Sequence, residues 1–212
     1  MVKLSKTAKM PCKSWSLAAG STCPGSIDPL TKLPVSLCKM CYAKGAFYNM
    51  PDAQKLRAFN REDWKREAWI REMVAALKGQ KFFRWFDSGD VYHPGLAKKI
   101  AAVIALTPDT SHWLPTKSYK IPKIREILEC IKSLPNVAVR YSSDSADGVY
   151  EAGLHGSVAI NYAEDETSAT VCGAYQRDGK CGDCRNCWDT SVAVIAYPLH
   201  GQKSKAYLKR KV

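Results

Sequence analysis

The sequence predicts an α/β fold, either a partial (β/α) barrel or a curved, mostly parallel sheet with cysteine-rich metal-binding loops. Strand-like and helix-like segments alternate through much of the chain, which is typical of crossover units that join parallel strands. The chain has 212 residues, whereas a closed eight-fold barrel typically needs ~250. We therefore expect an incomplete barrel or an open sheet. Nine cysteines predict the metal-binding loops.

The helices are predicted by apolar side chains at helical spacing and by residues that suit helix ends. The first begins near Pro51, which fits a first turn, and ends at Gly79. The second lies between Pro94 and Pro108, and the third starts at Pro122.

The strands are predicted from runs of β-branched and aromatic residues. They cover residues 81–86, 111–116, 137–141, 157–161 and 192–197. The first 50 residues are predicted as a short strand and a long irregular stretch, which bound metal would organise.

We expect a single domain over residues 1–212, with distinct segments inside it. These are a cysteine-containing N-terminal segment (1–50), a βα core (51–165 and 190–200), a cysteine-rich cluster loop (166–189) and a basic tail (201–212).

The net charge of +12 is concentrated at the two ends. Residues 1–50 hold seven lysines and one acidic residue, and residues 201–212 hold five basic residues and no acidic one. Basic ends of this kind bind phosphate backbones, so nucleic acid is a candidate partner. The alternative is a solubilising role.

No apolar run approaches the ~20 residues that span a bilayer, and we expect no membrane contact.

The sharpest motif is a late group of four cysteines, Cys172, Cys181, Cys184 and Cys187. No apolar signal-peptide stretch follows the N-terminus, so we expect a reducing compartment, where clustered thiols bind metal more often than they pair. Two successive C-x2-C spacings let one loop supply three corners of a [4Fe–4S] cluster, as in ferredoxins. Zinc held by four cysteines is the main alternative. Unligated thiols or disulfides are another.

A second predicted group consists of Cys12, Cys23, Cys38 and Cys41. The last two form a plausible metal knuckle, and the first two join them by count and by loop position. We expect a second metal site here, with iron–sulfur favoured over zinc. Cys130 lies inside the third helix and is predicted to be a buried structural thiol.

A candidate cofactor-binding pocket is predicted where the strands end. The ends of parallel strands share one edge of the sheet, where ligands bind in α/β folds. Asp87 lies there and could contact a polar ligand or act in acid–base chemistry, although a helix-capping turn is the alternative. No catalytic residue is assigned. The pocket residues are Ser88, Gly89, Asp90 and His93 after the first core strand, and Lys117 after the next.

These motifs resemble the bacteriophage "gene product 88" family of cysteine-rich proteins. The resemblance rests on Ser21-Thr22-Cys23-Pro24, Cys38-Lys39-Met40-Cys41-Tyr42-Ala43, Phe83 to Asp90, Trp113 to Lys117, and the late cysteines. It implies a viral protein located in the host cytoplasm. The lack of an apolar signal-peptide stretch predicts that the protein is not secreted.

The order of features also resembles radical S-adenosylmethionine enzymes at the level of the fold. Those enzymes place a cysteine loop after the first strand of a partial barrel and a Gly-Gly-Glu-like motif after the second. Here the loop from Cys23 to Cys41 and the Ser88-Gly89-Asp90 motif take those places. The C-x3-C-x2-C hallmark is absent, and four cysteines would close the cluster. S-adenosylmethionine is therefore possible as a cofactor but not favoured.

The sequence favours an iron–sulfur protein with one or two [4Fe–4S] clusters that serve electron transfer, sensing or structure. One alternative is a radical S-adenosylmethionine enzyme that modifies a nucleotide or nucleic acid. The other is a metal-stabilised module, with zinc as a possible metal, that binds nucleic acid, a virion component or a host protein. Enzymatic activity, reaction and substrate are left open.

Overall fold

The computed structural model describes residues 1–209, without the side chains of residues 46 and 47. The last three residues of the predicted basic tail, 210–212, lie outside the described residues. In the described part of the chain no helix is long and apolar enough to cross a membrane.

A five-stranded sheet forms the centre of the molecule, with the strands in the order β1-β2-β3-β4-β5. The neighbours from β2 to β5 pair in parallel, and β1 pairs antiparallel with β2. The mostly parallel α/β sheet predicted from the sequence is therefore confirmed. The strands are β1 (Ser5–Lys6), β2 (Lys13–Trp15), β3 (Phe82–Trp85), β4 (Ser111–Thr116) and β5 (Val137–Tyr141).

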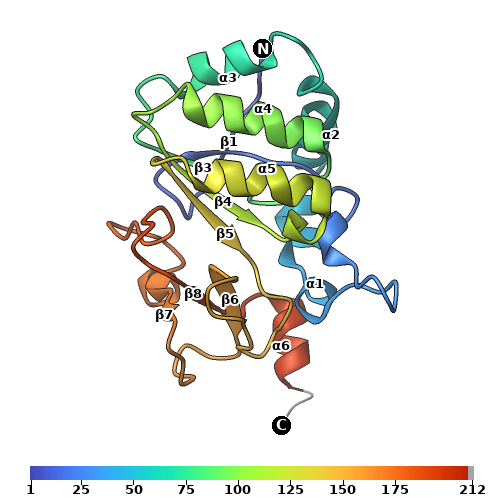
Figure 1. Ribbon diagram of the computed structural model, residues 1–212. Coiled ribbons are helices and arrows are strands. Elements are labelled where there is room, and N and C mark those ends of the chain that lie inside the picture. The colour runs from blue at the N-terminus through green and yellow to red at the C-terminus, as the bar shows by residue number, and fades with distance from the viewer. Residues whose placement is uncertain (210–212) are drawn as a thin grey trace.

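Helices cover one face of this sheet, as Figure 1 shows for α3, α4 and α5. The single helix predicted after Pro51 is two helices, α2 and α3. The chain turns between them because Lys99 Nζ donates to the carbonyls of Trp64 (2.9 Å) and Arg66 (2.6 Å), beyond the end of α2. The bounds are α2 (Pro51–Asp63), α3 (Trp69–Leu77), α4 (Pro94–Ala105) and α5 (Pro122–Lys132).

The main core lies between the sheet and these helices. Trp15, Trp69 and Trp85 are fully buried in it, and the ring of Trp15 meets the other two edge-on at 5.5 and 6.3 Å. Aromatic side chains of this size bury large apolar areas. They anchor β2 and β3, the two strands that precede the candidate pocket.

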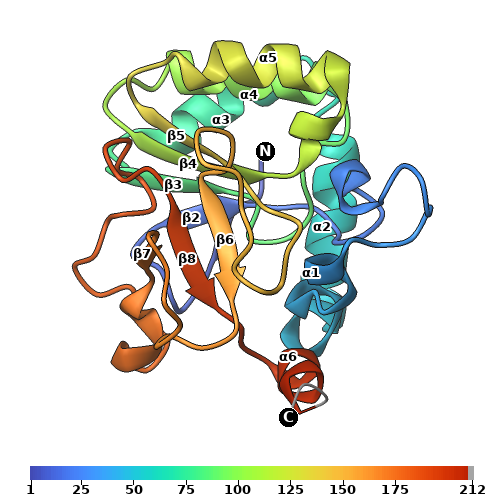
Figure 2. The same ribbon diagram turned by 60° about the horizontal axis from the view of Figure 1, so that its bottom comes forward.

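A second sheet of three parallel strands has the order β6-β8-β7. It lies on the side of the first sheet away from the helices (Figures 1 and 2). An isolated parallel bridge between Ser142 and Ser157 links β5 to β6. The described strands do not close into a barrel. The strands are β6 (Ser157–Ile160), β7 (Thr170–Val171) and β8 (Ile195–Pro198), the last starting three residues later than predicted.

The N-terminal segment differs from its prediction as one strand followed by irregular chain. It holds two strands and then four short helical elements, because a polar chain without a core of its own satisfies its backbone in local turns. The elements are η1 (Pro24–Ser26), α1 (Ser36–Lys39), η2 (Tyr42–Lys44) and η3 (Ala46–Asn49).

Three further helical elements complete the fold. η4 (Ser118–Lys120) follows β4, and η5 (Gly173–Arg177) lies in the cysteine-rich loop. Part of the predicted basic tail is a helix, α6 (Gln202–Leu208), which lies beside α1 in both views (Figures 1 and 2).

Candidate functional site

Three cysteines of the N-terminal segment, which we call the early thiols, lie beyond the C-terminal end of β2. They are Cys23, Cys38 and Cys41. Burial raises the pKa of Cys23 to about 12, and the charge of Asp90 adds to the rise. Cys41 and Cys38 are close enough to Cys23 to raise its pKa further. The three thiols therefore neighbour one another.

The Ser88-Gly89 pair holds this loop against the sheet. Ser88 Oγ donates to the carbonyl of Leu17 (2.6 Å) and accepts from Arg57 Nε (2.6 Å). Gly89 has φ +73°, and a Cβ placed there would lie 2.7 Å from both Leu17 Cβ and Thr22 Oγ1. Only glycine permits both this backbone conformation and this close approach.

Asp90 ties the same turn to the end of β4. Its carboxylate accepts from Thr116 Oγ1 (2.6 Å), from the backbone N–H of Lys117 (2.8 Å) and from that of Val91 (2.7 Å). Burial raises the pKa of Asp90, and these three donors work against the rise. Both carboxylate oxygens are thus engaged within the fold.

Lys117 connects the early thiols to the loop after β5. Its Nζ donates to the carbonyls of Ser142 (3.1 Å) and Ser143, and lies 3.5 Å from Asp144 Oδ1. Burial lowers the pKa of Lys117, and the charge of Cys38 works against that change. Lys117 therefore lies within electrostatic range of an early thiol.

His93 is not part of this arrangement. It is exposed, and its Nδ1 accepts from the N–H of Gly95 (3.0 Å) at the start of α4. Its ring lies against Trp64 at 5.5 Å. The structure thus brings Ser88, Gly89, Asp90 and Lys117 together and leaves His93 as a helix cap.

The late thiols, Cys172, Cys181, Cys184 and Cys187, come from the cysteine-rich loop. Burial raises the pKa of Cys181, and the charges of Cys172 and Cys184 add to the rise. Cys187 Sγ lies 3.2 Å from the hydroxyl of Tyr197 on β8. Cys172 also acts on the pKa of Cys187, so the four side chains form one neighbourhood. Their role as metal ligands stays a prediction.

Cys12 lies with the late thiols. It packs in a cluster with Met10, Cys181 and Cys187, and the N–H of Cys181 donates to the carbonyl of Lys9 (2.9 Å). The sequence groups Cys12 with the early cysteines, yet Cys12 precedes β2 and Cys23 follows it. Cys12 and Cys23 therefore lie beyond opposite ends of β2. Their positions in the sequence do not show which other cysteines each one neighbours.

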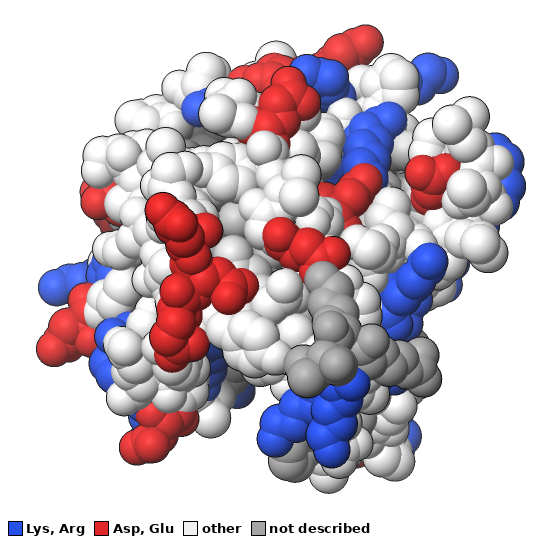
Figure 3. Space-filling model, turned by 90° about the horizontal axis from the view of Figure 1, so that it is seen from below, with Lys and Arg blue, Asp and Glu red and all other residues white. Residues whose placement is uncertain are grey.

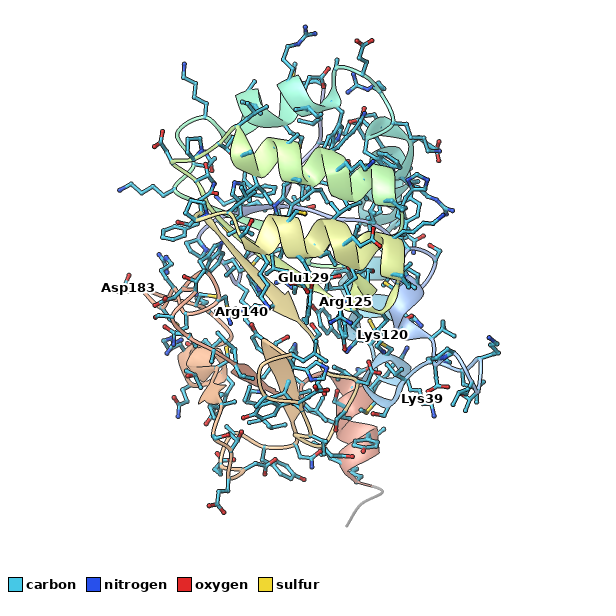
Figure 4. The ribbon with its side chains drawn as sticks, in the orientation of Figure 1. Lys39, Lys120, Arg125, Glu129, Arg140 and Asp183 are labelled. Carbon is cyan, nitrogen blue, oxygen red and sulfur yellow. The ribbon has the colours of Figure 1, made fainter. Side chains whose placement is uncertain are left out.

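Arg140 on β5 holds the end of the late loop. It is 3% exposed and donates to five backbone carbonyls. Figure 4 shows its position on the side of β5 that faces the segment containing Asp183. The five acceptors are those of Gly156, Asn186, Cys187, Asp189 and Val192, at 2.7 to 3.3 Å.

Cationic side chains surround the late thiols. Arg84 lowers the pKa of Cys12, Cys181 and Cys187, against the larger effect of burial. Arg140 acts in the same direction on Cys187. Burial keeps these cysteines as neutral thiols, and the cations beside them favour a bound group of negative charge.

In the described residues no three Cys, His, Asp or Glu side chains are oriented to converge on a single metal ion. Cys130, predicted to be buried, is exposed on α5. Its side chain lies outside the apolar stripe of that helix, where Ile124, Leu128 and Ile131 are buried. Cys130 therefore takes no part in either neighbourhood.

Charged residues are unevenly distributed on the face shown in Figure 3, where acidic groups gather in one region and basic groups in others. Lys203 and Lys205 of α6 are exposed.

Comparison with known families decides the membership of the chain. The family model for gene product 88 matches residues 2–190. The chain belongs to the gene product 88 family. This match confirms the family resemblance carried by the motifs and suggests a viral origin. No curated protein and no solved structure matches the chain. The likeness of this family member to radical S-adenosylmethionine enzymes stays a prediction.

Proposed function

We propose that this protein binds two iron–sulfur clusters in separate sites and uses the early one to bind and activate a small cofactor. The observation that carries the proposal is the position of Cys12 beside Cys181. It leaves three early thiols, Cys23, Cys38 and Cys41. The late thiols supply four ligands, with Cys12 next to them.

The donor set suits iron–sulfur clusters better than zinc. A single zinc ion draws four ligands onto one centre, whereas a cuboidal cluster spreads its cysteine ligands over the corners of a larger object. The two successive C-x2-C spacings of Cys181, Cys184 and Cys187 let one loop supply three corners of such a cluster. The cations around the late thiols favour a cluster of negative charge.

Three thiolates on a four-iron cluster leave one iron without a protein ligand. An amino group and a carboxylate on one carbon, as in S-adenosylmethionine, can occupy that position. When bound, the cluster would supply the electron that activates the cofactor. A closed early site, which the sequence favours, needs Cys12 as its fourth ligand, and the position of Cys12 beside Cys181 favours an open site instead.

The chain's own residues hold the early site in place. Ser88 and Gly89 fix the approach of the cysteine loop to the sheet. Asp90 and Lys117 join the loops after β3, β4 and β5. These are positioning roles, because the polar atoms of these side chains are engaged within the fold.

The test is paramagnetic resonance of anaerobically reconstituted, reduced protein with and without S-adenosylmethionine. We expect the cofactor to change the spectrum of the wild-type protein. Cys41→Ser should abolish the change, and Cys12→Ser should preserve it. An unchanged wild-type spectrum would contradict the open site. A change lost equally in Cys12→Ser would return Cys12 to the early ligands.

A further inference from the structure

Half-buried Arg84 and buried Asp87 have opposite charges, lie three residues apart at the end of β3 and interact electrostatically without forming an ion pair. Arg84 Nε and Asp87 Oδ1 are both buried and without a hydrogen-bond partner. No ion pair in the described part of the chain includes either residue. Buried charges without partners are costly, so the arrangement favours a ligand that supplies the missing partners.

The backbone between Arg84 and Asp87 departs from a regular strand. In a regular strand, residues three apart point to opposite faces. Phe86, between them, has φ +55°, a left-handed conformation that is unusual for a bulky residue. Its ring is 3% exposed and packs against Trp15 at 5.8 Å, which holds this conformation in place. Residues held this way are typical of functional sites.

The surroundings of Arg84 leave part of its guanidinium available. One face lies over the ring of Trp113 at 4.3 Å, and Nη1 reaches Met10 Sδ at 3.4 Å. Neither neighbour offers a negative charge. The charges of Tyr42 and Asp87 act on Arg84 and work to raise its pKa, against burial. Arg84 therefore lies between the late thiols and the turn that carries Tyr42.

We propose that Arg84 and Asp87 form a subsite for a free α-amino acid, whose carboxylate binds Arg84 and whose ammonium group binds Asp87. An α-amino acid carries both charges on one carbon and can bridge two nearby groups. Asp87 would repel a phosphate, and Arg84 would repel a simple amine. The proposed amino-acid subsite rests on the proposed function in one respect only, which is that the bound amino acid would be the substrate of the protein.

The experiment is calorimetric titration of the purified full-length protein with each of the twenty L-amino acids. Inorganic phosphate and adenosine monophosphate serve as comparison probes. The methyl ester and the N-acetyl form of the best amino acid remove one charge each. We expect the methyl ester and the N-acetyl form each to bind at least about tenfold more weakly than the free amino acid, since each loses a charged hydrogen bond.

Two variants assign each charge to its partner. Arg84→Gln should bind the amino acid and its methyl ester equally weakly, and Asp87→Asn should bind the amino acid and its N-acetyl form equally weakly. Arg71→Gln and Asp109→Asn change exposed residues and should bind like the wild type. Melting temperatures show whether each variant is folded.

Binding in Cys41→Ser separates this subsite from the cluster. A ligand held by Arg84 and Asp87 should still bind there, so failure of the proposed cluster function would not remove it. The proposal is overturned if no amino acid binds or if Arg84→Gln binds normally. It is also overturned if phosphate binds and depends on Arg84. A change in cluster potential alone in Arg84→Gln would show that Arg84 only offsets cluster charge.

Discussion

Gly25 sets how closely the early cysteine loop approaches the end of β4. A Cβ at this position would lie 2.0 Å from the carbonyl oxygen of Lys117, which is backbone and cannot move aside cheaply. We expect Gly25→Ala to destabilise the protein by about 1–3 kcal/mol in urea unfolding, the usual cost of overpacking. Gly45→Ala is the matched control, because its nearest atom lies 3.9 Å away. Equal stability of the two variants would show that the loop yields easily.

His112 makes stability depend on pH. It is fully buried on β4, and burial lowers its pKa from 6.5 to about 4. The unfolded chain binds the proton more readily, so stability is full above pH 6.5 and falls as the pH drops towards 4. The loss should be on the order of 3 kcal/mol.

Chemical unfolding at pH 7 and pH 4.5 measures this effect. Replacing His112 by Phe keeps a ring beside Trp85, which stacks on His112 at 6.1 Å, and removes the titrating group. The variant should lose most of the pH dependence in that window. If wild type and variant lose stability in parallel, other groups control the acid response.

Among the elements, the late loop depends on β5 through one side chain. Arg140 donates to five carbonyls, and a lysine offers only three donors from a single nitrogen. We expect Arg140→Lys to expose residues 181–192 to proteolysis, with cleavage sites located by mass spectrometry. Arg125→Lys on the exposed side of α5 should be cleaved like the wild type. Identical cleavage of both variants would mean that other contacts hold the loop.

Apolar residues at helical spacing and runs of β-branched and aromatic residues predict the elements well, because both reflect local burial. The bounds of β4 and β5 match their predictions. The break after α2 is not visible in the sequence, since it depends on Lys99 from another helix. Pairings across the sheet are equally hidden, and for that reason the neighbours of Cys12 and of Arg84 emerge only in three dimensions.

At the scale of the whole molecule, the basic ends predict electrostatic binding of nucleic acid. Residues 203–212 carry five basic side chains, three of them on or beside α6. Binding to DNA should weaken steeply with salt, and deleting residues 203–212 should flatten the slope, because fewer counterions are released. Replacing Lys78 and Lys81, exposed near the N-terminal end of β3, should change the slope less. A slope that ignores the deletion would exclude the tail from binding.

The division of the cysteines into two separate sites is the central claim, and iron and sulfide analysis of anaerobically prepared protein tests it most directly. We expect about eight irons in the wild type and about four in both Cys41→Ser and Cys184→Ser, since each variant keeps one [4Fe–4S] cluster. Cys12→Ser should retain both clusters. Stoichiometric zinc without sulfide, or loss of the same four irons from Cys12→Ser as from Cys41→Ser, would contradict the account.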